Sequence, residues 1–254
     1  MRPDLHELHR LVHVLVQRGL HGQRRHVRRG ERVRYQSGQL PRQCHLRQRR
    51  GLVCLHASAI AIGEHAIAVV GSAGSGKSTT AAAFSERGFR ILAEDVVTLD
   101  DRGDQFLVRP AYPCIRLWPA SVQALYGSES HLPKLTPNWD KCYLDLTDQF
   151  QRESLPLAAI YVLDERRDDS DAPFVVPLDR AEGLMALVAN TYATKLMDKE
   201  MRAREFELLT RVLNNVPLRR VTPHTDPARI PELCDSILND FGHSPCTALT
   251  STAG

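Results

Sequence analysis

The sequence feature that most limits the fold is the octapeptide at residues 71–78, GSAGSGKS, which fits the pattern G-x-x-x-x-G-K-[ST]. It follows an apolar run at residues 66–70 and precedes an alanine-rich helical segment at residues 78–87, which Gly88 ends. The glycines let successive backbone N–H groups turn inward, and the positive end of the helix dipole falls at the same point. The sequence therefore predicts a strand, a loop and a helix that together hold phosphate.

This loop pattern assigns chemistry to individual side chains. Lys77 would reach the β and γ phosphates of a nucleotide, and the Ser78 hydroxyl would complete the shell of a Mg²⁺ ion that bridges them. We therefore expect ATP and Mg²⁺ at this loop. The predicted nucleotide-binding residues are Gly71, Ser72, Ala73, Gly74, Ser75, Gly76, Lys77, Ser78 and Thr79.

Further candidate groups lie on strands that could approach the loop. A predicted strand at residues 91–93 ends at Glu94 and Asp95. Carboxylates there can hold Mg²⁺ or accept the proton of a hydroxyl that attacks the γ-phosphate. Neighbouring strand residues point to opposite sides unless the strand bends, so Glu94 and Asp95 could each take one of these roles. Alternatively, the two carboxylates could simply be the solvated end of the strand. His56 could lie beside the loop or be an ordinary partly buried histidine.

The remaining sequence predicts alternating strands and helices. Residues 52–55 and 57–62 are expected to form a strand pair joined near residues 63–64, and prolines 133 and 137 indicate an irregular loop that carries Lys141. Further strands are expected at residues 106–108, 113–117, 157–163, 174–176 and 216–221. Further helices are expected at residues 120–126, 179–193, 197–213 and 226–238.

The formal net charge of +3 combines two unlike parts of the chain. Residues 1–50 hold 13 arginines, no lysine and three acids, a net charge of +10, which leaves −7 for the rest. We predict an arginine-rich segment at residues 1–50, partly helical or poorly ordered, a catalytic domain at residues 51–240, and a disordered tail at residues 241–254. The basic segment could be a solvated arm, bind nucleic acid, or steer an acidic substrate segment by charge.

No apolar run approaches the roughly 18 residues of a membrane-spanning helix. The six cysteines form no C-x-x-C pair, a pattern that favours reduced thiols in a cytoplasm. We therefore expect a cytoplasmic protein with no membrane partner.

Three segments at fixed spacing resemble the catalytic domain of HPr kinase/phosphorylase. They are LHAS at residues 55–58, the loop at residues 71–78, and RGFRILAED at residues 87–95. The resemblance is strong over residues 51–100, and beyond them the chain looks closer to diverged HPr kinase-like proteins, some of which serve peptide-maturation clusters such as those of lasso peptides. It implies an α/β fold with a P-loop kinase core of the HPr kinase/PEP carboxykinase-like type, in which helices flank a mixed central sheet.

The resemblance also implies roles for matching residues. His56 and Lys77 fall on catalytic positions, Ser78 on a magnesium ligand, and Asp95 on the carboxylate that takes the serine proton. Glu94 stands where the family usually has aspartate; it keeps the charge with a longer reach, and we assign it to catalysis and to magnesium binding.

The sequence departs from the family pattern at two places, and both limit the function that we expect. The E-I-R-G signature, whose glutamate also helps to hold the metal, has its nearest match at residues 114–117, CIRL, with no carboxylate. No segment like P-G-R-N supplies the later catalytic arginine. Reversal of the reaction by phosphate and HPr itself as substrate are therefore not part of the expected function.

The preferred function is a Mg·ATP-dependent kinase that phosphorylates a serine hydroxyl of a peptide or small protein, such as a ribosomally made precursor peptide. A small-molecule kinase with the same ATP cradle and an ATP-sensing module without transfer are the alternatives. Further candidates for acceptor or phosphate contacts are Arg116, Lys141, Asn190 and Tyr192. A kinase core gives no reason to expect nucleic acid as a partner, and a homo-oligomer stays open.

Overall fold

The computed structural model describes residues 40–127, 132–136 and 139–242. The strands are β1 (Val53–Leu55), β2 (Ala57–Ile62), β3 (His65–Gly71), β4 (Ile91–Ala93), β5 (Val97–Asp101), β6 (Phe106–Arg109), β7 (Cys114–Leu117), β8 (Lys134–Thr136), β9 (Trp139–Asp145), β10 (Leu155–Leu163), β11 (Phe174–Pro177) and β12 (Leu218–Thr222). The helices are α2 (Leu40–Arg49), α3 (Lys77–Glu86), α4 (Pro119–Tyr126), α5 (Arg180–Ala189), α6 (Lys199–Asn215) and α7 (Ile230–Gly242), with 3-10 turns η2 (Thr194–Leu196) and η3 (Pro227–Arg229).

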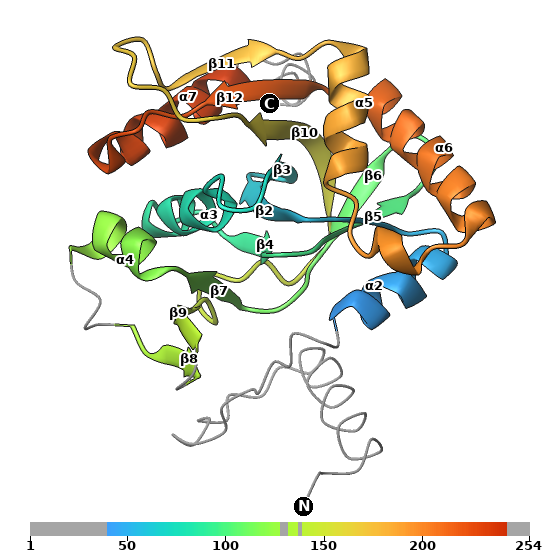
Figure 1. Ribbon diagram of the computed structural model, residues 1–254, viewed down its shortest axis with the longest axis horizontal. Coiled ribbons are helices and arrows are strands. Elements are labelled where there is room, and N and C mark those ends of the chain that lie inside the picture. The colour runs from blue at the N-terminus through green and yellow to red at the C-terminus, as the bar shows by residue number, and fades with distance from the viewer. Residues whose placement is uncertain (1–39, 128–131, 137–138, 243–254) are drawn as a thin grey trace, which may run out of the picture. The chain divides into compact units, whose positions relative to one another are not determined.

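A mixed sheet forms the centre of these residues (Figure 1). Strand β3 lies between β2, which is antiparallel to it, and β10, which is parallel, and β12 continues parallel on the far side of β10. In the register of β3 and β10, Gly71 lies opposite Leu163. The loop at residues 71–78 therefore leaves the sheet where the carboxyl ends of parallel strands meet, the usual place for a ligand in an α/β fold.

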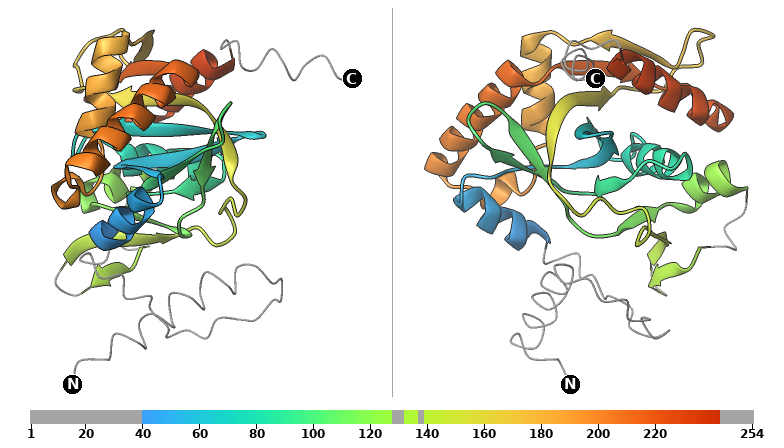
Figure 2. Two further views of the ribbon diagram at one scale, coloured as in Figure 1. Left: turned by 90° about the vertical axis from the view of Figure 1, so that its right-hand side faces the viewer. Right: turned by 180° about the vertical axis from the view of Figure 1, so that it is seen from behind.

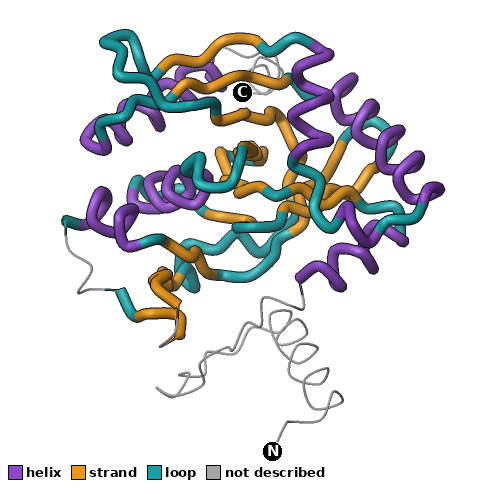
Figure 3. The backbone as a smooth tube through the Cα atoms, in the orientation of Figure 1, coloured by secondary structure: helices purple, strands orange, loops and turns teal. Residues whose placement is uncertain are grey.

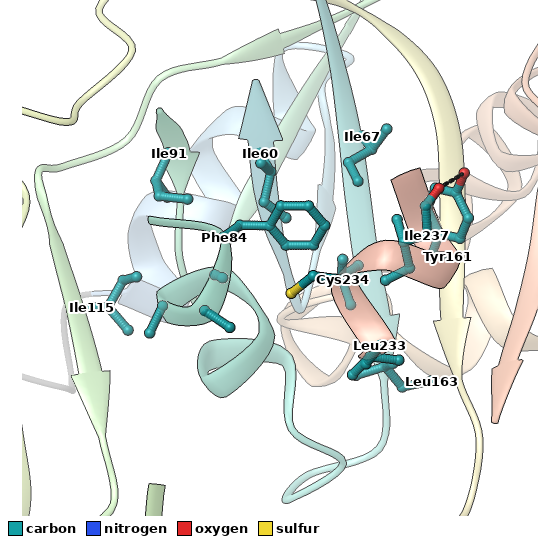
Figure 4. Close-up of a cluster of buried hydrophobic side chains, with 14 of the residues drawn as sticks. Ile60, Ile67, Phe84, Ile91, Ile115, Tyr161, Leu163, Leu233, Cys234 and Ile237 are labelled. Carbon is teal, nitrogen blue, oxygen red and sulfur yellow. Dashed lines mark hydrogen bonds between the residues drawn. The ribbon is translucent and has the colours of Figure 1, made fainter. Parts of the chain in front are cut away.

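Helices cover both faces of the sheet (Figure 2). On β2 and β3, Ile60 and Ile67 point to one face and pack with buried residues of α3 and α7, as Figure 4 shows. Ala59 and Ala68 point to the other face, in the cluster that holds the buried side chains of α5 and α6. Strands covered on both sides are apolar throughout, which explains the unbroken run at residues 66–70. The predicted α/β class with a mixed central sheet and flanking helices is confirmed.

The strands predicted at residues 52–55 and 57–62 are present, but the prediction that they pair with each other is wrong. Strand β1 pairs antiparallel with β5, whereas β2 forms a hairpin with β3 around residues 63–64. Strand β5 was not predicted at all, because its last two residues are aspartates, which are rare in strands.

The segment predicted as an irregular loop also contains regular structure. Residues 139–145 form β9, between β7 and β8 in a small antiparallel sheet, and are drawn as strand in Figure 3. Pro133 directly precedes β8 and lies outside it, so this proline borders a strand rather than excluding one.

Two predicted helix ends move. The helix that Asp179 caps ends at Ala189 instead of residue 193. Helix α7 spans Ile230–Gly242, whereas the sequence predicted a helix over residues 226–238. Phe241 is buried because it follows Ile237 by four residues on the same apolar face. Residues 243–254, the remainder of the predicted tail, fall outside the described residues.

Helix α2 comes from the arginine-rich segment and belongs to the same compact unit as the sheet. Its inner side buries Cys44 and Gln48, and Arg47 donates a hydrogen bond to the Thr98 hydroxyl (2.8 Å). Helix α2 thus packs with the sheet although it precedes the change of composition at residue 51. The rest of that segment, residues 1–39, lies outside the described residues.

The described cysteines, which leave out Cys246, are all free thiols. Within the same part of the chain, no helix combines the length and the hydropathy that a membrane crossing needs.

Candidate active site

The loop between β3 and α3 owes its shape to glycine. Gly71 has φ +154° and Gly76 has φ +113°. A Cβ on Gly71 would lie 2.7 Å from Ser75 Oγ and 3.0 Å from the Leu163 carbonyl oxygen, so no larger residue fits there. Gly76 precedes α3 without a side-chain cap, and the N–H groups of the first helical turn are therefore left for another acceptor.

Lys77 begins α3 and its side chain turns back across the loop. The buried ammonium donates hydrogen bonds to the carbonyl oxygens of Gly71 (2.7 Å) and Ser72 (2.9 Å). Burial lowers the pKa of Lys77 to about 8, while the charges of Asp95 and Glu94 oppose that shift. An anion in the loop would therefore meet a cation that is held in place and only weakly hydrated.

Ser78 and Glu94 form an oxygen pair next to this cation. The Ser78 hydroxyl donates to Glu94 Oε1 (2.7 Å), and the buried Glu94 Oε2 has no hydrogen-bond partner, although Arg116 Nε lies 3.5 Å away. Burial raises the pKa of Glu94. A hydroxyl beside a carboxylate with an unused oxygen suits Mg²⁺, which prefers oxygen ligands and keeps several waters. Among the described residues no cluster of three or more His, Cys, Asp or Glu could hold a metal, so this pair would share the ion with phosphate and water.

Asp95 lies where the chain bends after β4. Its φ of +70° is rare for a residue with a side chain, and this bend turns both carboxylates toward Arg116 instead of to opposite sides. Asp95 Oδ2 lies 2.6 Å from Arg116 Nη2, and Asp95 Oδ1 lies 3.5 Å from His56 Nδ1. The strand bend that the sequence left open is thus present, and it brings the two acids together.

His56 completes a dyad with Asp95. Its Nδ1 lies 3.1 Å from the Asp95 carbonyl oxygen and faces the carboxylate as well, and since both are acceptors, we assign the proton to Nδ1. Burial and the charge of Lys77 lower the pKa of His56, so the ring is neutral at neutral pH. Nε2 is then left as an acceptor.

The other predicted contact residues surround this dyad. Arg116 is 5% exposed and pairs with both carboxylates. Asn190 Oδ1 accepts the Gly71 N–H (3.3 Å), and its carbonyl accepts the His56 N–H (2.7 Å). The ring centroids of Tyr192 and His56 are 6.0 Å apart. Lys141 lies over the Trp118 ring at 5.0 Å, and its charge lowers the pKa of Lys77.

Two further residues contact the loop or its helix: Thr79, which the sequence predicted, and Arg166, which it did not. The Thr79 hydroxyl donates to Ser121 Oγ (2.8 Å), which anchors α4. Arg166, three residues after β10, donates to the Ser75 carbonyl oxygen (3.2 Å), and its Nη2 lies 3.1 Å from the place where a Cβ on Gly76 would stand. The signal was the polar run DERR directly after the predicted strand at residues 157–163, because loops at the carboxyl ends of neighbouring parallel strands meet.

The fold and this site define a mixed α/β domain with a glycine loop suited to phosphate and, beside it, a carboxylate and histidine pair suited to moving a proton. No family model and no curated protein matches the chain. Among solved structures, it is similar to the Hpr(Ser) kinase/phosphatase from Coxiella burnetii, with 13% identity and a TM-score of 0.41, over 74% of this chain and 94% of that chain.

Proposed function

We propose that this protein is a Mg·ATP-dependent kinase that transfers the γ-phosphoryl group to a serine hydroxyl of a peptide or small protein, in the cytoplasm. The observation that carries the proposal is that two groups of residues lie next to each other: the uncapped start of α3 with Lys77, and the dyad of Asp95 and His56. The hydrogen bond from Ser78 of α3 to Glu94, the residue before Asp95, joins them. The first holds and neutralises phosphate, and the second takes a proton from an attacking group. Phosphoryl transfer needs both of these functions.

The loop supplies the binding step. The N–H groups at the start of α3 and the dipole of this helix would hold the β and γ phosphates, and Lys77 would exchange its bonds to the Gly71 and Ser72 carbonyls for phosphate oxygens. Ser78 and Glu94 would hold Mg²⁺, which when bound neutralises charge on the bridged phosphates. Arg166 lies at the outer side of the loop, where a second cation could reach the same oxygens.

The dyad supplies the acid–base step. The serine oxygen forms a bond to the γ-phosphorus, the bond from that phosphorus to the bridging oxygen breaks, and ADP leaves with that oxygen. Asp95 accepts the hydroxyl proton as the bond forms. Arg116 holds the carboxylate in place, and His56, with Nε2 as an acceptor, orients the incoming hydroxyl. Positioning and electrostatics provide most of the rate enhancement.

An assay of ADP release separates this function from the alternatives. Wild-type protein with Mg·ATP is incubated with a pool of serine peptides, with a pool of small alcohols, or with neither, and Lys77→Ala serves as the matched control. Our proposal predicts that only the peptide pool stimulates ADP release and that Lys77→Ala abolishes the stimulation. Stimulation by small alcohols alone would establish the small-molecule kinase instead. ATP binding without stimulation by either pool would establish the sensor.

A further inference from the structure

A groove lies between α2 and η2, outside the residues assigned to phosphoryl transfer. It has a volume of about 320 Å³ and is lined by Arg42, His45, Leu46 and Leu196. The two leucines are 54% and 47% exposed, an unusual state for large apolar side chains that line one groove. Burial of such side chains against a partner is the usual source of affinity in protein contacts.

The outer face of α2 adds positive charge to this apolar groove. The helix contains four arginines within or directly after it and no acid. Arg42 and Leu46 are four residues apart and both exposed, so they form one stripe on the outer face, and the exposed Arg50 follows the last residue of the helix. Within the described residues Arg42 makes no ion pair. On the opposite, inward side of the helix Gln48 is buried. The stripe thus offers alternating positive and apolar groups to a partner.

Both segments that line the groove meet at Tyr192, a neighbour of the dyad. Gln48 of α2 donates a hydrogen bond to the Tyr192 carbonyl oxygen (2.8 Å), and the Tyr192 ring packs near His56. Leu196 lies four residues further along the same segment. A peptide with its serine at Asp95 could therefore continue past Tyr192 into the groove within a few residues, since an extended chain covers about 3.3 Å per residue.

We propose that this groove docks the segment that flanks the acceptor serine, and that this segment carries acidic and apolar side chains together. The proposal rests on the kinase function above and names its substrate class. Charge selects the occupant: residues 1–39 of the chain hold nine arginines against three acids and so do not complement the arginines of α2, whereas an acidic and apolar peptide does. The peptide contacts Leu46 and Leu196 with its apolar side chains and Arg42 with a carboxylate.

Three synthetic peptides of one length test the docking. The first has a serine followed by alternating leucines and glutamates, the second replaces the glutamates by lysines, and the third replaces the leucines by glutamines. Fluorescence anisotropy gives their dissociation constants for the full chain carrying Lys77→Ala, in which transfer is blocked. We expect the first peptide to bind at least tenfold more tightly than either other peptide.

Groove variants identify the contact. Leu46→Asp should weaken the first peptide roughly tenfold or more. Arg42→Glu should weaken the first peptide and strengthen the lysine peptide, a reversal that general loss of structure would not produce. Met185→Asp, at a 68% exposed position on α5, is the control and should change neither constant. Thermal melting establishes that each variant is folded.

The possible results separate docking from catalysis. Binding of the first peptide that depends on Leu46, without its phosphorylation by wild-type protein, supports the groove and contradicts the kinase. Phosphorylation with a KM that Leu46→Asp does not change supports the kinase and overturns the groove. Equal binding of the three peptides also overturns it. If Leu46→Asp instead dissociates an oligomer in analytical ultracentrifugation, the groove contacts a second copy of the chain and peptide docking is wrong.

Discussion

Asp95 combines a strained backbone with two partners that fix its carboxylate. Its φ of +70° costs energy for most side chains, and asparagine is among the residues that tolerate this region. The ion pair with Arg116 and the contact with His56 account for the position of its side chain. Strain that surrounding contacts maintain in this way is typical of functional sites.

Asp95→Asn tests the role of this carboxylate as the base. The variant keeps shape and backbone conformation but cannot accept a proton, so kcat for peptide phosphorylation should fall by roughly 10²- to 10⁴-fold. The dissociation constant for ATP should stay within roughly threefold of wild type, because Asp95 does not line the loop. Steady-state kinetics and calorimetric titration measure the two quantities. Asp104→Asn, in the exposed turn after β5, is the control; a catalytic rate unaffected by Asp95→Asn would remove Asp95 from the mechanism.

Lys77 makes ATP binding depend on pH. Its pKa of about 8 in the free protein means that the ammonium, which phosphate binding requires, is lost as the pH rises through 8. The dissociation constant for ATP should therefore increase roughly tenfold between pH 7 and pH 9. Titration with a fluorescent ATP analogue measures this. Lys77→Arg keeps its charge over the whole range and should show a flat profile, and a flat wild-type profile would contradict the assignment.

Arg166 should contribute to nucleotide binding more than to turnover. We expect Arg166→Ala to raise the KM for ATP roughly three- to tenfold, as for the loss of one exposed charge-assisted hydrogen bond, with kcat changed less than twofold. Its exposed neighbour Arg167 provides the matched control, Arg167→Ala, which should behave as wild type. A fall in thermal stability without a change in KM would indicate that Arg166 only braces the loop.

Helices α2 and α6 meet around a buried carboxyl group. Glu205 of α6 is 6% exposed, and burial raises its pKa to about 7, while the nearby Gln48 side chain opposes that shift. Gln48 also holds the Tyr192 carbonyl, so this contact between helices supports the segment beside the dyad. The position of Tyr192 thus depends on packing between two elements that lie far apart in the sequence.

Glu205 predicts a loss of stability with rising pH. The folded chain keeps the Glu205 proton up to about pH 7, whereas the unfolded chain loses it near the ordinary value of 4.5. Unfolding between these values releases a proton, so the free energy of unfolding falls as pH rises, by up to about 3 kcal/mol. Denaturant unfolding should show Glu205→Gln more stable than wild type at pH 8 and similar at pH 4.5. The exposed Glu207→Gln should follow wild type; parallel curves for wild type and Glu205→Gln would disprove the prediction.

The elements predicted well were those with a local signal. The loop at residues 71–78, the strand before it and the helix after it follow from glycine spacing and apolar runs, and the position of Glu94 and Asp95 follows from the strand that ends before them. The pairing of β1 with β5 could not be predicted because the two strands lie far apart in the sequence. Strands β5 and β9 were not recognised because their polar residues conceal the strand pattern.

The same limit applies to the site. Arg116 was named as a candidate from the sequence, but its pairing with both carboxylates depends on β7 and β9, which pack beside α3 and α4. Arg166 reaches the loop only because β10 lies parallel to β3. Both contacts come from strand order, which a single sequence does not encode in any short pattern.

The whole chain unites an acidic body with a basic helix that packs on it. Residues 51–254 carry a net charge of −7, yet the loop is locally cationic, and α2 together with the residue after it holds four arginines. One positive region lies at the loop, where we propose that ATP binds. The other lies on α2 near Tyr192, where we propose that the acceptor segment docks. The net charge of +3 for the whole chain indicates neither of these positive regions.

The most direct test of the central claim is the intact mass of serine peptides after incubation with the full chain, ATP and Mg²⁺, followed by fragmentation to locate the modification. The account predicts a gain of one phosphoryl group on a serine with wild-type protein, and no gain with Lys77→Ala or Asp95→Asn. An unchanged peptide mass with wild-type protein that binds ATP, or the same gain with both variants, would contradict it.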